Sequence, residues 1–344
     1  MQKPVLVIKL GSATISKADG SVNITIIKRI TDEIAALSAN WRIVLVSSGA
    51  VGSGKASIQN YKGSITERKA AAAVGNPILI QLYHACFSKH GISVAQALCE
   101  RHHFSNRRQF LQLKETFAMF WNNNILPVVN ENDLVSNIEL QFSDNDELAT
   151  LIAVGFDAAT LIVCTSVGGF LDNERKIIPV IEKIDKSIQG YVQHDKSSLG
   201  LGGMLSKLTF TRLATSLGIK VIICGVTKPN FFALALEGLN GTTFIPQKSN
   251  FKARQKWLAS GSITLGNILL DTGAAKALAN RKSLLTVGIK QIEGNFMAGE
   301  VVQLMNDVQE IIGVAKVKLN AKDMRAQIAQ KNIIAAHADD IVIF

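Results

Sequence analysis

Near its start the chain reads Val5-Leu6-Val7-Ile8-Lys9-Leu10-Gly11-Ser12, an apolar strand that carries one lysine and ends in a glycine-serine turn. A nearly continuous apolar run of this length is typical of a strand buried on both faces of a parallel sheet. In open α/β sheets, ligands bind outside the carboxyl ends of the strands, where loop N–H groups can hold an anion. The stretch therefore predicts an anion site around Lys9, Gly11 and Ser12.

Short apolar runs alternate with amphipathic stretches over the first 250 residues. Helices are predicted after Asn23, a good N-cap, and over residues 108–122 and 204–217. The alternation predicts an α/β fold in which an open, mostly parallel sheet is sandwiched by helices. The predicted strands are Val5–Leu10, Ile43–Ser47, Val94–Leu98, Ile125–Val129, Thr160–Cys164 and Val221–Cys224.

The pattern changes near Asn250, after which segments are shorter and glycines recur. Runs such as Glu300–Leu304 and Ile311–Val317 predict strands of a small, mostly β domain. We therefore expect a first domain over residues 1–250, a linker at about 251–260 and a second domain over 261–344.

Composition narrows the class of protein. Hydrophobic residues make up 47% and aromatic residues only 6%, which predicts an aliphatic core. The net charge of +10 raises the question of a nucleic-acid partner, but no basic run stands out, and anionic substrates explain it equally well. The four cysteines form no C-x-x-C pair, and no run approaches about 18 apolar residues. We expect a cytoplasmic protein with free thiols, no structural zinc and no membrane span.

Four more segments fall at predicted strand ends or helix starts: Ser47–Val51, Asn130–Asp133, Ser143–Glu147 and Gly200–Met204, the last followed by Ser206 and Lys207. Small residues let backbone amides approach a ligand, and a helix start favours an anion. Taken singly, each has an ordinary explanation: a loop, an N-cap at Asp144, or a solvated lysine. Five such segments at successive strand ends predict one shared site.

These segments resemble the amino acid kinase family and, within it, the glutamate 5-kinases. The carboxyl-terminal domain, residues 261–344, resembles a PUA domain, and its most recognisable part runs from Gly288 to Val302. The resemblance implies ATP-dependent phosphorylation of the γ-carboxylate of L-glutamate, the first step of proline biosynthesis. It is carried by Val7–Ser12, Val46–Ala50, Ala72–Asn76, Pro127–Asp133, Asp144–Asp146, and Gly202–Met204 with Lys207.

The resemblance also implies roles for individual residues. Lys9, Lys207 and Asp146 would be catalytic, and Gly11, Ser12 and Gly49 would form the phosphate loop. The glutamate contacts would be Ser48, Asp133 and Asn145. ATP would contact Lys9, Thr165, Ser166, Leu201, Gly202, Gly203, Met204, Leu205, Ser206 and Lys207. Mg²⁺ would be held mainly by the ATP phosphates, so we expect no metal cage built by the protein.

One segment departs from the family pattern. After Cys164 the chain reads Thr165-Ser166-Val167-Gly168-Gly169-Phe170-Leu171-Asp172-Asn173, where the family has threonine-aspartate, glycine-leucine-tyrosine and aspartate-proline-arginine. Leu201 and Leu205 also stand where smaller polar residues are usual. In the family these positions face the base and ribose, so the sequence leaves nucleotide affinity and base preference open.

Three alternatives stay open at this stage. A related kinase could act on aspartate or N-acetylglutamate, although a carboxylate in Asn130–Asp133 favours an ammonium group over an acetylated one. A catalytically weak regulatory paralogue is suggested by Ser166, but Lys9, Asp146 and Lys207 oppose it. RNA binding by the PUA-like domain is opposed by the lack of clustered basic charge. The resemblance further implies a homo-oligomer, a dimer or tetramer, and proline as a feedback inhibitor.

Overall fold

The computed structural model describes residues 2–105, 107–134, 145–185, 187–188, 190–191, 201–247, 264–328, 330 and 332–343. It divides into two compact units. The first comprises residues 1–100 and 111–248, and the second residues 101–110 and 249–344. The expected linker at 251–260 lies outside the described residues, as do Ser143, Asp144 and Gly200.

The first unit is built on one sheet with the strand order β3-β4-β2-β1-β5-β7-β8-β6 among the described residues. Neighbouring strands are parallel except β8, which runs antiparallel to β7. The predicted mostly parallel α/β sheet is confirmed. The bounds are β1 Val5–Leu10, β2 Arg42–Ser47, β3 Ser93–Cys99, β4 Ile125–Glu131, β5 Thr160–Cys164, β6 Val180–Ile181, β7 Lys220–Cys224 and β8 Thr242–Phe244.

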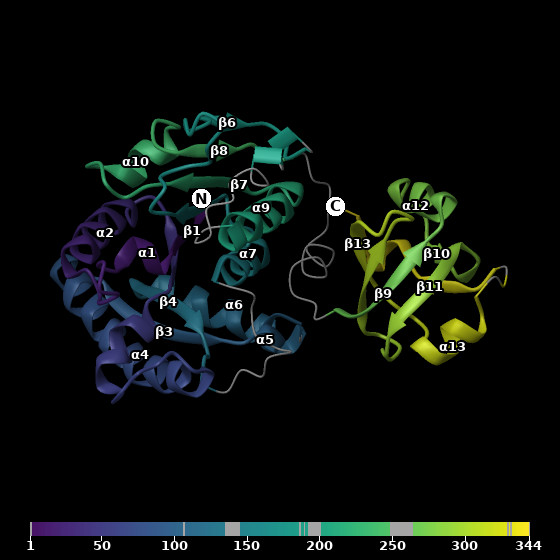
Figure 1. The fold of residues 1–344 in the computed structure, drawn as a ribbon, viewed down its shortest axis with the longest axis horizontal. Helices are drawn as coiled ribbons and strands as arrows, with labels where there is room; N and C mark the ends of the chain where they lie inside the picture. Colours follow the sequence, from purple (N-terminus) through teal and green to yellow (C-terminus); the bar gives the residue numbers. More distant parts are fainter. Residues whose placement is uncertain are drawn as a thin grey trace. The chain divides into compact units, whose positions relative to one another are not determined.

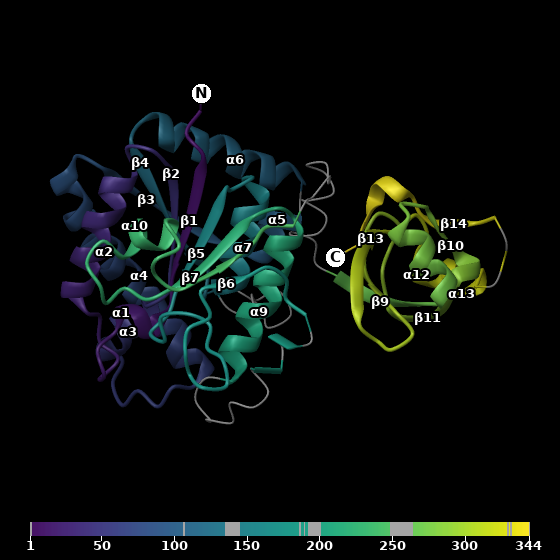
Figure 2. The same ribbon diagram turned by 90° about the horizontal axis from the view of Figure 1, so that it is seen from above.

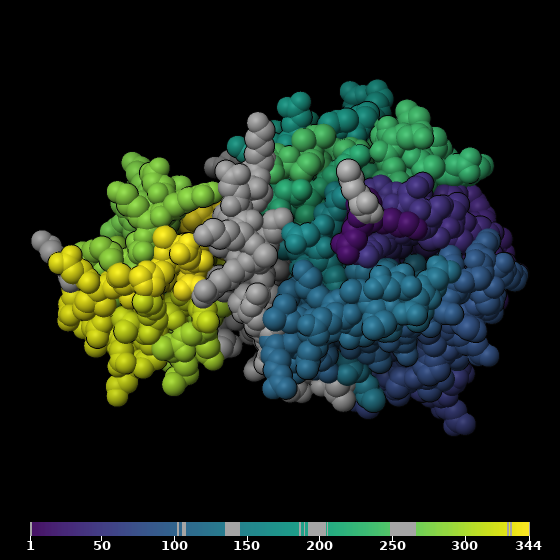
Figure 3. Space-filling view, turned by 180° about the vertical axis from the view of Figure 1, so that it is seen from behind, coloured from purple at the N-terminus to yellow at the C-terminus, as the bar shows by residue number. Residues whose placement is uncertain are grey.

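Strand β1 lies in the middle of this sheet, between β2 and β5. Residues 6–10 of the strand are all buried, as expected for a strand covered on both faces. Its apolar side chains Leu6, Ile8 and Leu10 belong to the main hydrophobic cluster. In the space-filling view the N-terminal segment, in purple, lies between blue and green parts of the unit (Figure 3). The lysine of the opening stretch is therefore carried by a central, buried strand of the sheet.

Helices cover both faces of the sheet (Figures 1 and 2). Helices α2, α4 and α10 pack on one face, and α6, α7 and α9 lie on the other. The predicted N-cap is confirmed, since the side chain of Asn23 accepts a hydrogen bond from the Ile26 amide at 3.2 Å. The bounds are α1 Ser12–Ile15, α2 Ile24–Leu37, α3 Ala50–Gly54, α4 Ile65–Phe87, α5 Arg101–Ser105, α6 Arg107–Asn122, α7 Asn145–Gly155, α9 Leu201–Ser216 and α10 Phe231–Leu236.

One predicted helix boundary is wrong. The helix expected over 204–217 begins at Leu201, so Gly202 and Gly203 lie in its first turn and Lys207 lies nearly two turns in. Glycine fits a first turn because it adds no side chain, and the first amides of a helix have no intrahelical partner.

Helix α4 is long and apolar enough, by length and composition, to span a membrane. Its side chains Leu79, Tyr83 and Phe87 are instead buried in the main hydrophobic cluster. Tyr83 makes a 2.7 Å hydrogen bond with the hydroxyl of Ser47, at the end of β2. Helix α4 is therefore a core helix of the first unit.

Helices α3 and α4 touch backbone to backbone. A Cβ added to Gly75 on α4 would lie 1.8 Å from the carbonyl oxygen of Ala50 on α3. One added to Gly54 on α3 would lie 2.0 Å from the carbonyl oxygen of Ala71 on α4. Only glycine fits at both positions, and this contact fixes the short helix that follows Gly49.

In its described residues, the second unit has a five-stranded sheet, in the order β11-β9-β12-β13-β15, and a two-stranded pair β10-β14. The predicted small, mostly β domain is confirmed. Its hydrophobic core includes Ile268, Leu304 and Met324. The bounds are β9 Thr264–Leu270, α12 Thr272–Ala279, β10 Leu284–Leu285, β11 Ile289–Gly294, β12 Val301–Met305, β13 Ile311–Lys316, α13 Ala321–Ala326, β14 Ile334–Ala336 and β15 Ile341–Ile343.

The glycine contact between α3 and α4 can be tested by Gly75→Ala. The added methyl group must push α3 away from α4, so we expect the free energy of unfolding to fall by about 1–3 kcal/mol. Urea denaturation measures this change. The matched control is Gly190→Ala, because a Cβ at Gly190 would meet no atom within 4 Å. Equal stability of Gly75→Ala and the parent protein would contradict the tight contact.

Candidate active site

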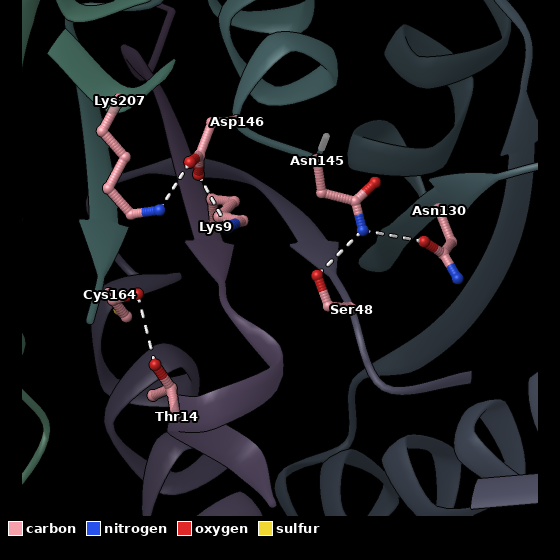
Figure 4. A network of polar contacts seen from close by, with 8 residues as sticks. All are labelled: Lys9, Thr14, Ser48, Asn130, Asn145, Asp146, Cys164 and Lys207. Atoms are coloured by element: carbon pink, nitrogen blue, oxygen red, sulfur yellow. Dashed lines mark hydrogen bonds and ion pairs between the residues drawn. The ribbon is translucent and has the colours of Figure 1, made fainter. Parts of the chain in front are cut away.

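Two lysines from distant parts of the sequence meet at one carboxylate. Lys9 Nζ, from β1, lies 2.6 Å from Oδ1 of Asp146. Lys207 Nζ, from α9, lies 2.7 Å from Oδ2 of the same side chain. Figure 4 shows the carboxylate between the two ammonium groups. The predicted convergence of Lys9, Asp146 and Lys207 is observed, and we call these three residues the ion-paired triad.

The triad is withdrawn from solvent. The exposed side-chain fractions are 6% for Lys9, 3% for Asp146 and 18% for Lys207. Burial alone would raise the pKa of Asp146, but the two ammonium groups outweigh it and hold that pKa below its usual range. The carboxylate therefore stays ionised at neutral pH, and the three side chains together carry one excess positive charge.

The start of helix α7 supplies two neighbouring functional groups. Asp146 joins the triad, while Asn145 donates from Nδ2 to Ser48 Oγ at 2.9 Å and to Asn130 Oδ1 at 3.0 Å (Figure 4). Asn130 in turn donates to Asn76 Oδ1 at 3.1 Å. This amide relay runs from α4 through β4 to α7 and fixes the orientation of Asn145.

A cavity of about 600 Å³ opens beside Asn145. Five of the predicted site residues line it: Ser12, Ser48, Gly49, Asp133 and Asn145. These residues come from loops after β1, β2 and β4 and from the start of α7, so the carboxyl ends of the strands converge as predicted. The remaining lining residues are Ala13, Ser16, Gly20, Ala50, Val51, Gly52, Lys55, Arg68, Asn130 and Glu131.

Two glycine loops border the site. Gly11 precedes α1, and Thr14 Oγ1 in that helix donates to the carbonyl oxygen of Cys164 at 3.2 Å (Figure 4). Gly49 has a φ of 107°, and an added Cβ there would lie 2.7 Å from Cδ1 of Ile15. The second loop therefore requires glycine for its backbone conformation, and the side chain of Ile15 packs closely against it.

Asp133 brings a carboxylate to the cavity. Burial raises its pKa, while the positive charges of Arg68 and Lys69 act in the opposite direction. A partly buried carboxylate beside a polar cavity is suited to bind an ammonium group.

Of the residues implied to bind nucleotide, Lys9 and Lys207 belong to the ion-paired triad, and Thr165, Ser166, Met204 and Ser206 are not among the cavity lining. Thr165 is buried, and its hydroxyl accepts a hydrogen bond from the Gly168 amide at 3.0 Å, whereas Ser166 is exposed. Met204 and Ser206 are half-buried on α9. Gly202, Gly203, Leu201 and Leu205 belong to the same helix, and the side chains of the two leucines lie outside the described residues. A role in nucleotide binding stays a prediction for all of them.

Sequence reasoning missed three residues of the site. Asn76 lay within a quoted motif but was given no role, and Arg68 and Lys55 were not considered. Their roles depend on tertiary contacts. The packing of α3 against α4 brings Lys55, just after α3, and Arg68 to the cavity lining, and Asn76 of α4 meets Asn130 of β4. Within the described ranges, no group of three or more His, Cys, Asp or Glu side chains is placed to hold a metal ion.

Comparison with known proteins adds family relationships. Residues 4–225 match the amino acid kinase family, and residues 266–334 match the PUA domain. The chain is 35% identical to the glutamate 5-kinase of Bacteroides thetaiotaomicron, over 93% of this chain and 92% of that protein. It is 36% identical to the glutamate 5-kinase of Aquifex aeolicus, over 93% and 90%. It is 32% identical to that of Haemophilus influenzae, over the full length of both.

Solved structures share the fold. Carbamate kinase from Giardia lamblia bound to AMP-PNP matches with a TM-score of 0.54 at 17% identity, covering 71% of this chain and 99% of that one. A second structure of the same Giardia enzyme gives a TM-score of 0.52 at 18% identity, covering 72% and 100%.

Removing the charge of Asp146 tests the triad. Asp146→Asn leaves buried ammonium groups without their counter-ion, so we expect the free energy of unfolding at pH 7 to fall by about 3–5 kcal/mol. Because the folded pKa of Asp146 is lowered, its stabilisation is complete above the usual aspartate range and is lost as pH falls through the folded value. Urea titrations from pH 7 downward should therefore show the two proteins converging in acid. A constant difference at every pH would contradict the assignment.

Proposed function

The chain belongs to the amino acid kinase family, within the glutamate 5-kinases, and we propose how its first unit transfers the γ-phosphoryl group of ATP to the side-chain carboxylate of L-glutamate. One observation carries this proposal. Asp146 of the ion-paired triad directly follows Asn145, whose oriented amide lines a cavity together with the carboxylate of Asp133. The start of α7 thus connects the cationic groups suited to a phosphoryl group with the polar groups suited to an amino acid.

The reaction requires positive charge in the site more than it requires a general base. The side-chain carboxyl group of glutamate has a pKa of about 4.3, so the nucleophile is already ionised at pH 7. The barrier comes from bringing this anion in line with the anionic γ-phosphate. Positioning and positive electrostatics therefore supply the catalysis.

We assign Lys9 and Lys207 to the phosphoryl group during transfer. Their ammonium groups share the carboxylate of Asp146, which holds them close together in spite of their mutual repulsion. The excess positive charge of the triad stabilises the transferring group. Gly11 and Gly49 contribute backbone N–H donors, and Ser12, the first residue of α1, directly follows Gly11.

The amino acid occupies the cavity. Its γ-carboxylate faces Gly49 and Ser48, and its ammonium group binds the carboxylate of Asp133 beside Asn145. An N-acetylated amino acid has no such positive charge, so it would leave the carboxylate of Asp133 without a counter-ion. This charge requirement favours a free amino acid over N-acetylglutamate.

Mg²⁺ accompanies ATP in this proposal. When bound to the phosphates it offsets their negative charge. Both oxygens of Asp146 already lie within 2.7 Å of an ammonium group, so this carboxylate is a poor candidate for a metal ligand. We therefore assign the ion to the ATP phosphates and its water shell.

Several features stay proposals. We place the kinase domain at residues 1–250 and the PUA domain at 261–344. The free buried cysteines Cys86, Cys99, Cys164 and Cys224 support a reducing, cytoplasmic location. A homo-oligomer and feedback inhibition by proline stay predictions drawn from the family.

A panel of acceptors tests the substrate. With Mg-ATP and hydroxylamine, the purified protein should form the hydroxamate from L-glutamate and at most a small fraction of that from aspartate or N-acetylglutamate. GTP in place of ATP tests base preference in the same assay. A faster reaction with N-acetylglutamate would overturn the assignment of Asp133 to the ammonium group.

Lys207→Ala tests the role of the triad in turnover. Loss of one of the two ammonium groups should lower kcat by about 100-fold or more, with a smaller effect on KM for glutamate. Lys28→Ala is the matched control, since Lys28 is exposed on α2 and does not line the cavity. Melting curves establish that both variants are folded. An unchanged kcat in Lys207→Ala would contradict the role given to this lysine.

A further inference from the structure

The cavity carries two cationic side chains of its own, Lys55 and Arg68. The ammonium group of Lys55 donates a hydrogen bond to the backbone carbonyl of Asp19, in the loop after α1. The guanidinium of Arg68 makes no hydrogen bond and no ion pair with any residue that the structure describes. Among the described residues, the guanidinium donors of Arg68 are therefore unused and stand at the cavity.

The backbone that carries Arg68 is fixed. Ser64 and Glu67 form a capping box at the start of α4, in which Ser64 Oγ accepts from the Glu67 amide and Glu67 Oε2 accepts from the Ser64 amide at 2.8 Å. Arg68 follows directly and donates its own amide to the Ser64 carbonyl at 2.9 Å. The start of a 23-residue helix also adds positive potential at this place. This corner of the cavity is suited to an anion.

Arg68 and Asp133 act on each other through space. Both side chains line the same cavity, and the positive charge of Arg68 acts to lower the pKa of Asp133, against the larger effect of burial, which raises it. An amino acid carries its ammonium and carboxylate groups on one carbon atom. A site for that pair needs an anion and a cation side by side, and Asp133 and Arg68 provide them.

We propose that Arg68 binds the α-carboxylate of the amino acid substrate, while Asp133 binds its ammonium group. The inference rests on the proposed function of the cavity and adds a specificity determinant to it. The planar guanidinium can form two parallel hydrogen bonds to a carboxylate, which a lysine cannot. The site then selects acceptors that carry both a carboxylate to be phosphorylated and an α-amino-acid head group.

The test compares substrates that differ by one group. 4-Aminobutyrate is glutamate without its α-carboxylate, and glutarate is glutamate without its ammonium group. In Arg68→Ala we expect KM for glutamate to rise about 10-fold or more, with kcat within about threefold of the parent value. The kcat/KM for 4-aminobutyrate should be the same in the variant and the parent, because this substrate has no α-carboxylate for Arg68 to bind. The kcat/KM for glutarate should fall by the same factor as that for glutamate, because glutarate keeps the carboxylate that Arg68 binds.

Three variants complete the design. Arg68→Lys keeps the positive charge but cannot form two parallel hydrogen bonds to a carboxylate. Its KM for glutamate should lie between those of the parent and Arg68→Ala. Asp133→Asn should raise KM for glutamate, and it should leave KM for glutarate unchanged because glutarate has no ammonium group. Arg212→Ala, at an exposed position on α9 outside the cavity lining, should change none of these constants. Where turnover of an analogue is too slow, its inhibition constant against glutamate replaces KM, and melting curves establish folding.

An unchanged KM for glutamate in Arg68→Ala would overturn the proposal. An equal fall in kcat/KM for glutamate and 4-aminobutyrate would also overturn it, because the arginine would then affect the cavity without contacting the α-carboxylate. Failure of the proposed function looks different: the parent protein would prefer another acceptor, such as aspartate. The same comparison would then use aspartate and 3-aminopropionate, which is aspartate without its α-carboxylate. The role of Arg68 would be tested by whether Arg68→Ala lowers kcat/KM for aspartate but not for 3-aminopropionate.

Discussion

The ion pairs of Asp146 with Lys9 and Lys207 are the constraint on which the rest of the first unit depends. Two ammonium groups cannot be held together away from water unless a carboxylate lies between them. Lys9 is carried by the central strand of the sheet, and Lys207 by a helix that packs against α7. The sheet order and the packing of α9 on α7 together bring the three side chains to one point.

The start of α7 joins the two halves of the site. Asn145 faces the cavity and Asp146, the next residue, faces the lysines. The amide relay through Asn130 and Asn76 ties this helix start to α4. Helix α4 also fixes the loop at Gly49 through its glycine contact with α3. Changes in α4 are therefore transmitted to both the amino acid cavity and the loop that borders it.

Sequence patterns predicted the parts of the fold that are dictated locally. Strands β1 and β5 have the predicted bounds, because buried parallel strands appear as continuous apolar runs. Strands β6 and β8 were missed, since two or three residues carry no periodicity. The motifs at the strand ends predicted the triad and five cavity residues. The sequence patterns did not predict Asn76 and Arg68 as site residues, because their roles arise from contacts between α4 and distant segments.

The central claim is that both lysines of the triad hold one phosphoryl group as it moves to a carboxylate. A crystal structure with Mg-ADP, aluminium fluoride and L-glutamate, which mimics the transferring group, tests it most directly. The account predicts that Nζ of Lys9 and Nζ of Lys207 both lie within hydrogen-bonding distance of the fluoride, with the glutamate side chain on its far side. A metal fluoride bound away from either ammonium group would contradict the account.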